Sequence, residues 1–166
     1  FEKDSFVCED QKSVYPVLDN IPSFLKEGDV VGDNAKYQKL YDKIGRFTGS
    51  VFWFFCRAFR LDTVSKRKEL LSDLVVQAGD KVLETSIGAG ANIPPLTKDA
   101  KYIGVDISLE MLRACQKYHL VKPYDLTLVH ANAEQLPFKD NVFDVVFHVG
   151  GINFFTDPKQ AVKEMV

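Results

Sequence analysis

The sequence has few cysteines and no long apolar run. Its three cysteines, Cys8, Cys56 and Cys115, are far apart and odd in number. Scattered thiols of this kind are typical of reduced cytosolic proteins, so we expect no disulfide framework and a cytoplasmic location. The densest apolar run, 51–56, is followed by Arg57. It is far shorter than the ~20 residues that span a bilayer, so no transmembrane segment is expected.

A strong excess of charge of either sign is also missing. The 166 residues carry a formal net charge of −2. This balance gives no electrostatic reason for nucleic acid to be the main partner, and none is expected. Hydrophobic residues make up 46% of the chain, which is typical of a globular protein and argues against disorder. The length allows one domain with a packed core and a small appendage.

Three parts are expected along the chain: 1–27, 28–78 and 79–166. The first part has two short apolar runs separated by Asp19-Asn20, a pattern that indicates a β-hairpin. The last part alternates apolar runs with helical patterns. Such alternation predicts a mainly parallel, doubly wound α/β sheet with right-handed crossovers.

The middle part, 28–78, is expected to be a helical cap. Apolar spacings of three and four residues predict a helix over about 35–60, broken or kinked near Gly45 and Gly49. A second helix is predicted over 65–76, with Ser65 as its N-cap.

The last part is expected to contain four strands and their connecting helices. The strands are predicted at Lys81–Thr85, Lys101–Ile107, Leu126–Ala131 and Val142–Val149. The helices are predicted at about 91–98 and 109–119, with a short element near 133–136 and a last helix opening at Asp157-Pro158.

The most informative segment is the turn after the first of these strands. The strand ends at Glu84, and the small-residue turn Ser86-Ile87-Gly88-Ala89-Gly90 follows. About twenty residues later the next strand ends at Asp106. Strand, tight turn, helix, strand and acid in this order are the signature of a nucleotide cradle, in which the second acid accepts hydrogen bonds from ribose hydroxyls.

Two further segments should reach the same edge of the sheet. Asn132-Ala133-Glu134 follows the third strand, beside the place expected for an adenine edge. The fourth strand carries Phe-Asp-Val-Val-Phe and runs through His148 into Val149-Gly150-Gly151. Ligands of open α/β sheets bind at this carboxyl edge, where the strand order reverses.

Residues 79–166 resemble the class I S-adenosylmethionine-dependent methyltransferases, especially those like the ubiquinone/menaquinone C-methyltransferases. The matching stretches are VLETSIGAGAN, YIGVDISLEML, ANAEQLPFKDNVFDVVF and FTDPKQAVKEM. The resemblance implies S-adenosylmethionine as cofactor, a small and possibly lipophilic methyl acceptor, and a seven-stranded Rossmann-like fold that is truncated here after the fourth strand.

The resemblance also implies a role for each matching residue. Glu84 and the turn (Ser86, Gly88, Gly90) would hold the methionine part, and Asp106 would bind the ribose. Ile107 and Met111 would pack on the adenine, while Asn132 and Ala133 would meet its edge. His148 would lie where the fourth strand meets the cofactor.

Two positions depart from the family pattern. Ser86 stands where the first turn glycine is usual, at some cost in backbone freedom. Asn132 replaces the usual aspartate, and its amide still offers a carbonyl oxygen. These departures motivate an alternative hypothesis, a catalytically inactive methyltransferase-like binding or scaffold module. An NAD-dependent dehydrogenase fits less well, because its usual Gly-x-Gly-x-x-Gly spacing is absent.

The N-terminal segment resembles the second half of a small zinc-ribbon domain. Its Cys-x-x-Cys is reduced to Cys8, with Gln11 in the second place. A structural zinc site needs four thiolate or imidazole ligands, so no metal is expected and the hairpin should survive as packing.

The catalytic group is not settled by the sequence. His148 is a candidate base or substrate contact, and Tyr41 is a second candidate because a tyrosine in the cap could shield the sulfonium. The aromatic segment 51–59 suggests helix core, a roof for an apolar pocket, or a surface for homodimerisation. The open sheet edge is a second possible dimer contact.

Overall fold

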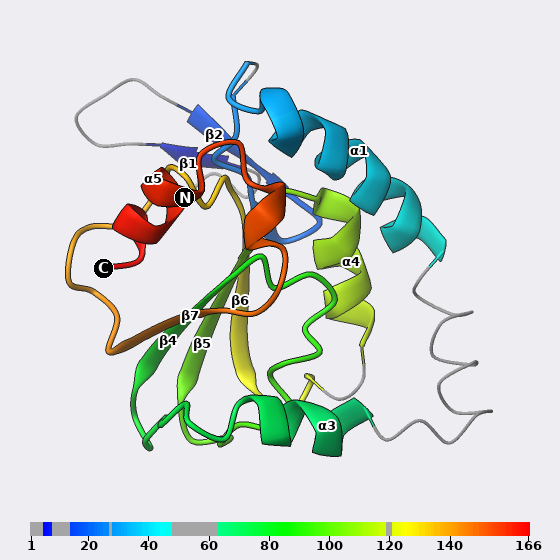
Figure 1. Cartoon of the computed structure of the whole chain (residues 1–166). Coiled ribbons are helices and arrows are strands. Elements are labelled where there is room, and N and C mark those ends of the chain that lie inside the picture. Colours follow the sequence, from blue (N-terminus) through cyan, green and yellow to red (C-terminus); the bar gives the residue numbers. More distant parts are fainter. Residues whose placement is uncertain (1–4, 8–13, 27, 48–62, 119–120) are drawn as a thin grey trace.

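The computed structural model describes residues 5–7, 14–26, 28–47, 63–118 and 121–166. Its centre is a four-stranded parallel sheet in the order β6-β5-β4-β7. The strands are β4 (Lys81–Thr85), β5 (Lys101–Asp106), β6 (Asp125–His130) and β7 (Val145–His148). The mainly parallel, doubly wound fold predicted from the sequence is thus confirmed (Figure 1).

The inner strands are apolar on both faces. Val82 and Val105 are fully buried, and Leu83 is nearly so. Leu83 and Val105 pack in one core cluster, whereas Val82 and Tyr102 pack in another, larger cluster. Burial on both faces explains why these strands are continuous apolar runs rather than alternating ones.

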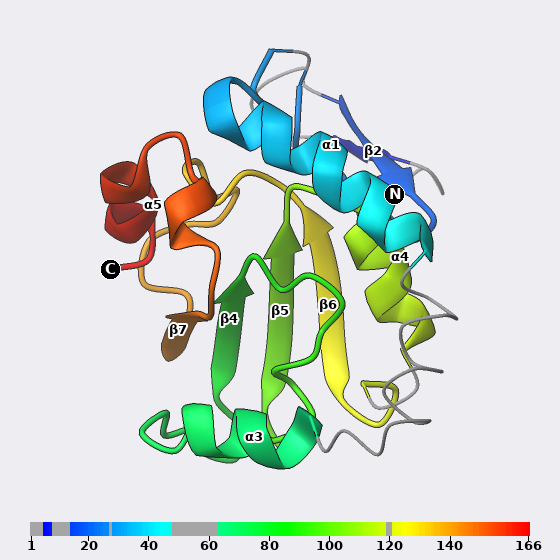
Figure 2. The same cartoon turned by 45° about the vertical axis from the view of Figure 1, so that its right-hand side comes forward.

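The strand order reverses beside β4. The chain runs from β4 to β5 and then to β6 in one direction, and β7 returns to the other side of β4. The carboxyl ends of β4, β5 and β7 therefore meet at one edge of the sheet. Helix α1 (Gly32–Phe47) crosses this edge, whereas α3 (Thr63–Leu70) lies at the opposite end of the sheet (Figure 2).

The N-terminal hairpin forms as predicted. Strands β2 (Val14–Leu18) and β3 (Ile21–Pro22) pair antiparallel around Asp19 and Asn20, whose φ angles are 53° and 64°. Positive φ at both central residues is the conformation of a type I′ hairpin turn. A third strand, β1 (Ser5–Val7), pairs with β2 and was not predicted.

The hairpin is tied to the sheet at β6. Ser23 bridges His130, and the Ser23 Oγ lies 2.8 Å from the His130 Nδ1. The His130 Nε2 donates to the Ile107 carbonyl at 3.1 Å, which leaves Nδ1 to accept from the serine hydroxyl. Burial lowers the pKa of His130 and favours this neutral form.

Several predicted elements differ in the structure. Helix α3 begins at Thr63 and ends at Leu70, so Ser65 lies inside it and is not the N-cap. Residues 91–98 form turns rather than a helix, because Pro94 and Pro95 lack N–H donors and restrict the residues before them. Residues 133–136 are likewise a turn.

The remaining helices agree more closely with the prediction. Helix α4 covers Leu109–Lys117, and α5 covers Pro158–Glu164. Asp157 caps α5 by accepting from the Gln160 N–H at 3.0 Å. A short 3₁₀ helix, η2 (Ile152–Phe154), precedes α5 and was not predicted. The aromatic segment 51–59 and Cys8 lie outside the described residues.

No helix among the described residues is long and apolar enough to cross a membrane.

Helix α1 packs on α4 at Gly45. A Cβ atom on Gly45 would lie 2.7 Å from the backbone carbon of Glu110 and 2.9 Å from its carbonyl oxygen. Backbone atoms cannot move away as a side-chain end can, so the close crossing of the two helices depends on glycine at this position.

We therefore predict that Gly45→Ala destabilises the protein despite its better helix propensity. Overpacking against a backbone costs about 1–3 kcal/mol, which exceeds the ~1 kcal/mol that alanine gains over glycine in a helix. Urea unfolding would measure the change, with the exposed Lys43→Ala as control in the same helix. A more stable Gly45→Ala protein would contradict the close crossing.

Candidate functional site

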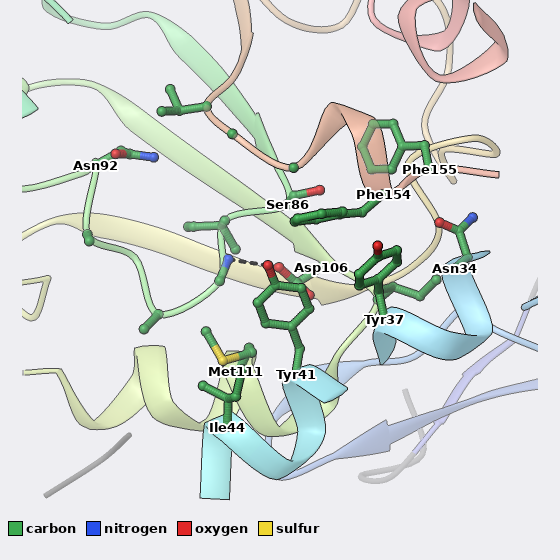
Figure 3. Close-up of a pocket in the computed structure, with 18 of the residues that line it drawn as sticks. Asn34, Tyr37, Tyr41, Ile44, Ser86, Asn92, Asp106, Met111, Phe154 and Phe155 are labelled. Atoms are coloured by element: carbon green, nitrogen blue, oxygen red, sulfur yellow. Dashed lines mark hydrogen bonds between the residues drawn. The ribbon is translucent and has the colours of Figure 1, made fainter. Parts of the chain in front are cut away.

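A cavity of about 430 Å³ lies at the carboxyl edge of the sheet. It is bounded by the turn after β4, the ends of β5 and β7, helix α1, and η2 (Figure 3). Most of its lining is apolar, and Asp106 is the carboxylate that faces it. The volume falls within the range of small-molecule sites, roughly 300–1,000 Å³.

The turn after β4 brings backbone close to this cavity. Ser86, Gly88 and Gly90 all have positive φ, at 56°, 56° and 77°. A Cβ on Gly90 would lie 2.5 Å from the Cys115 Sγ, so glycine is needed there for packing on α4 as well as for conformation. The Ile87 N–H donates to the Val105 carbonyl and anchors the turn to β5.

Asp106 is the polar centre of the site. Its Oδ2 accepts from the Gly88 N–H at 2.8 Å, and its Oδ1 accepts from the Ser108 N–H at 2.8 Å. Burial raises its pKa to about 6, although these two hydrogen bonds act in the opposite direction. Each oxygen keeps further acceptor capacity, which suits a pair of hydroxyl donors.

Glu84 lies behind the cavity wall. It is buried, and its Oε1 accepts from the Asn92 Nδ2 at 2.5 Å. The Asn92 Oδ1 in turn accepts from Arg67 of α3, and both Arg67 and Asn92 line the cavity. The Glu84 Oε2 has no partner among the described residues, and burial raises the pKa of this carboxyl to about 8.

An aromatic group forms the opposite wall. The rings of Tyr37 and Phe154 lie 4.2 Å apart, and Tyr41 lies 6.2 Å from Phe154. Figure 3 shows these three rings gathered near Asp106. Burial, and then the charge of Asp106, raise the pKa of Tyr41, so its hydroxyl stays protonated at neutral pH.

Glu134 connects the two segments that carry these rings, α1 and the η2 region. Its Oε1 accepts from the Asn34 Nδ2 of α1 at 2.7 Å, and from the Thr156 and Asp157 N–H groups at 2.8 and 3.1 Å. One carboxylate oxygen thus holds the start of α1 against the loop that follows η2.

His148 ends β7 beside Thr85. Its Nδ1 lies 3.1 Å from the Thr85 carbonyl, which can only accept, so Nδ1 carries the proton. Its Nε2 is buried without a partner among the described residues. Burial lowers the pKa of His148, which keeps the ring neutral at pH 7.

The structure brings together some of the predicted site residues and separates others. The predicted residues that line the cavity are Tyr41, Ser86, Gly88, Asp106, Ile107 and Met111. The predicted residues outside its lining are Glu84, Gly90, Asn132, Ala133 and His148. Asn132 instead accepts from the Glu134 N–H through its Oδ1 and stabilises a turn.

Several lining residues were not predicted. Arg67, Asn92 and Phe154 reach the cavity from three separate segments. The position of Asn92, two residues after Gly90, was a local signal for a role near the turn. Nothing in the local sequence marked Arg67 or Phe154. Among the described residues, no group of three or more metal-ligating side chains lies together.

Comparison with known proteins identifies the family. A family model described as a methyltransferase domain matches residues 83–166, about half of the chain. The chain belongs to this family, the class I S-adenosylmethionine-dependent methyltransferases, and its cofactor is S-adenosylmethionine. The resemblance of residues 1–27 to a zinc ribbon stays a prediction, because the family model matches only residues 83–166.

The chain is similar to two kinds of curated methyltransferase. It is 34% identical over 106 residues to a demethylmenaquinone methyltransferase of Shouchella clausii, covering 61% of this chain and 45% of the relative. It is 34% identical over 91 residues to a phthiotriol/phenolphthiotriol dimycocerosates methyltransferase of Mycobacterium tuberculosis, covering 53% and 33%. The chain thus spans less than half the length of these relatives.

Solved structures agree on the fold. The magnesium protoporphyrin IX methyltransferase of Synechocystis, solved with its bound cofactor, superposes with a TM-score of 0.59 at 17% identity. The match covers 83% of this chain and 72% of that one. At this identity the likeness concerns the fold alone.

The residues at the edge of the sheet fit the cofactor. Asp106 offers carboxylate oxygens to a ribose, and the positive-φ turn lets backbone approach the ligand. The buried Glu84 Oε2 is a polar atom for which the described residues provide no partner.

The positive φ of Ser86 yields a stability prediction. A left-handed conformation costs an L-residue roughly 1–2 kcal/mol, part of which glycine recovers. Ser86→Gly should therefore stabilise the fold by about 0.5–1 kcal/mol in urea unfolding. Ser86→Ala keeps the strain and serves as control. A destabilised Ser86→Gly protein would show that the hydroxyl matters more than the conformation.

Glu84 should make stability depend on pH. Its pKa is about 8 in the folded protein against an ordinary value of 4.5, so the folded state binds the proton more tightly. The resulting stabilisation is complete below about pH 4.5 and is lost as the pH rises toward about 8. Wild-type stability relative to Glu84→Gln should fall across this window. A difference that is constant from pH 5 to pH 8 would exclude the shift.

Proposed function

We propose that the protein transfers a methyl group from S-adenosylmethionine to a small, lipophilic acceptor. The observation that carries the proposal is the buried Asp106 carboxylate facing a largely apolar cavity at the point where the strand order reverses. The cofactor supplies an electrophilic methyl group. The protein therefore has to bind the two reactants, orient them and exclude water.

The cofactor side of the cavity is the side of the β4 turn. Asp106 accepts hydrogen bonds from the ribose hydroxyls, and the apolar side chains of Ile107 and Met111 pack on the base. Glu84 and Asn92 belong to the methionine end. Arg67, which lines the cavity beside Asn92, presents a guanidinium to the carboxylate of that end.

The acceptor side is the aromatic wall. Tyr37, Phe154 and Phe155 present rings to the cavity, and Val149 adds an aliphatic surface. Such a lining suits a lipophilic acceptor with a ring or chain that packs on aromatic faces. The names of the two curated relatives, which refer to menaquinone and mycocerosate lipids, support the same substrate class.

We assign Tyr41 to cofactor binding, and we consider His148 as a base. The raised pKa of Tyr41 keeps its hydroxyl protonated, so it is not the base. Its ring lines the cavity, and we propose that it stabilises the positively charged sulfonium by cation–π contact. The Nε2 of His148 keeps an unprotonated lone pair, but it is buried outside the cavity lining. His148 is therefore our candidate base only for an acceptor that reaches this atom past the neighbouring Val149, which lines the cavity.

The adenine contacts of Asn132 and Ala133 remain a proposal, and the hydrogen bond from Glu134 gives Asn132 a structural role as well. A homodimer through residues 51–59 or through the open edge beside β7 and a cytoplasmic location also remain proposals.

Asp106 provides the test. Asp106→Asn should weaken S-adenosylhomocysteine binding roughly 10- to 100-fold, because one hydrogen bond to a charged acceptor contributes about 1.5–3 kcal/mol. Calorimetry measures the affinity, and Asp125→Asn, exposed on β6, is the matched control. Transfer of a radiolabelled methyl group to an organic-extractable quinone tests the substrate class. No binding of S-adenosylhomocysteine to the wild-type protein would overturn the proposal.

A further inference from the structure

The outer face of α1 concentrates positive charge. Lys36, Lys39, Lys43 and Arg46 follow one another at spacings of three, four and three residues, which places them on the same side of a helix. All four are exposed. We call these four residues together with Leu40 the basic face; Leu40 is 48% exposed in their midst.

The opposite side of the helix packs against the rest of the protein. Asn34 and Gly45 are buried, and Gln38 donates to the Ile107 carbonyl at 2.8 Å. Asp42 turns inward, where it accepts from the Ser108 hydroxyl at 2.6 Å. The basic face is therefore the side of α1 that is directed away from the sheet. Helix α1 itself lies at the periphery of the molecule (Figure 2).

Little of this positive charge is neutralised. Arg46 lies 3.8 Å from Glu110, which also pairs with Arg113 at 2.7 Å. Among the described residues, Lys36, Lys39 and Lys43 form no ion pair. The whole chain carries a net charge of −2, so the cluster is a local feature and not part of a generally basic surface.

The basic face borders the cavity. Ile44 follows Lys43 on α1, lines the cavity and is still 41% exposed, so the cavity opens beside it. Tyr37 and Tyr41 of the same helix line the interior. A surface that contacts α1 from outside therefore lies next to the cavity opening at Ile44.

We propose that the basic face docks the protein on an anionic lipid surface. Lysine and arginine are attracted to anionic headgroups, and their long stems lie along apolar surface while the charges stay in water. Exposed Leu40 and Ile44 provide the apolar contact that a lipid interface favours and that a nucleic acid backbone does not.

Docking would bring the cavity entrance to the surface in which a lipophilic acceptor is dissolved. This delivery role rests on the proposed function, whereas the docking itself does not. The attraction between a few cations and an anionic leaflet is modest and is screened by salt, so binding should be reversible and sensitive to ionic strength.

Co-sedimentation of the full chain with lipid vesicles tests the proposal. We expect binding to vesicles of equal phosphatidylglycerol and phosphatidylcholine at least tenfold tighter than binding to pure phosphatidylcholine, with loss of this preference in high salt. Lys39→Glu/Lys43→Glu should lose at least tenfold of the affinity. The matched control, Lys98→Glu/Lys122→Glu, changes exposed lysines elsewhere and should bind as the wild type does.

Three outcomes would overturn the proposal. They are equal binding to both vesicle types, an equal loss in the control variant, and tighter binding to single-stranded RNA than to the anionic vesicles. Calorimetry with S-adenosylhomocysteine on the same variants separates the two proposals. A Lys39→Glu/Lys43→Glu variant that binds the cofactor product but no longer sediments with the vesicles supports the docking surface. A wild-type protein that sediments with anionic vesicles but does not bind S-adenosylhomocysteine counts against the proposed function alone.

Discussion

The carboxylate of Asp106 is the contact on which the site depends. It fixes the turn after β4 through Gly88 and the start of α4 through Ser108. The Ser108 hydroxyl then donates to Asp42 of α1, so one buried acid at the end of β5 is linked to the cap as well. The group that would bind the ribose is therefore also the group that organises the walls around it.

Helix α1 is tied to the site by polar side chains. Helix α1 contacts the site loops through three polar side chains, Asn34 to Glu134, Gln38 to the Ile107 carbonyl, and Asp42 to Ser108. Its apolar residues Leu40 and Ile44 are substantially exposed. The close crossing with α4 at Gly45 and the contact of Tyr37 with Phe154 add packing to these hydrogen bonds, so α1 is held on the site from two directions.

Much of this arrangement could be predicted from the sequence, because it depends on local patterns. The buried strands, the Asp19-Asn20 turn and the pairing of a small-residue turn with Asp106 all follow from residue type and spacing. The contacts of Arg67 with Asn92 and of Tyr37 with Phe154 join segments 25 and more than a hundred residues apart, and no local pattern encodes them. The helix predicted over 91–98 was wrong. It was expected as the crossover between two parallel strands, but Pro94 and Pro95 prevent helical hydrogen bonding there.

Two buried acids favour positive over negative charge in the cavity. Asp106 lies in the lining and Glu84 just behind it, and burial raises both pKa values. A cation bound between them would lower both pKa values and recover part of the desolvation cost, whereas an anionic group there would add to it. The cofactor carries a sulfonium and an amino group, both positive, and its single carboxylate is the group that we propose for Arg67. A dinucleotide with its pyrophosphate at the β4 turn would instead place negative charge beside both acids. We therefore expect a cofactor with positive charge near the β4 turn to suit this edge better than a nicotinamide cofactor with its pyrophosphate there.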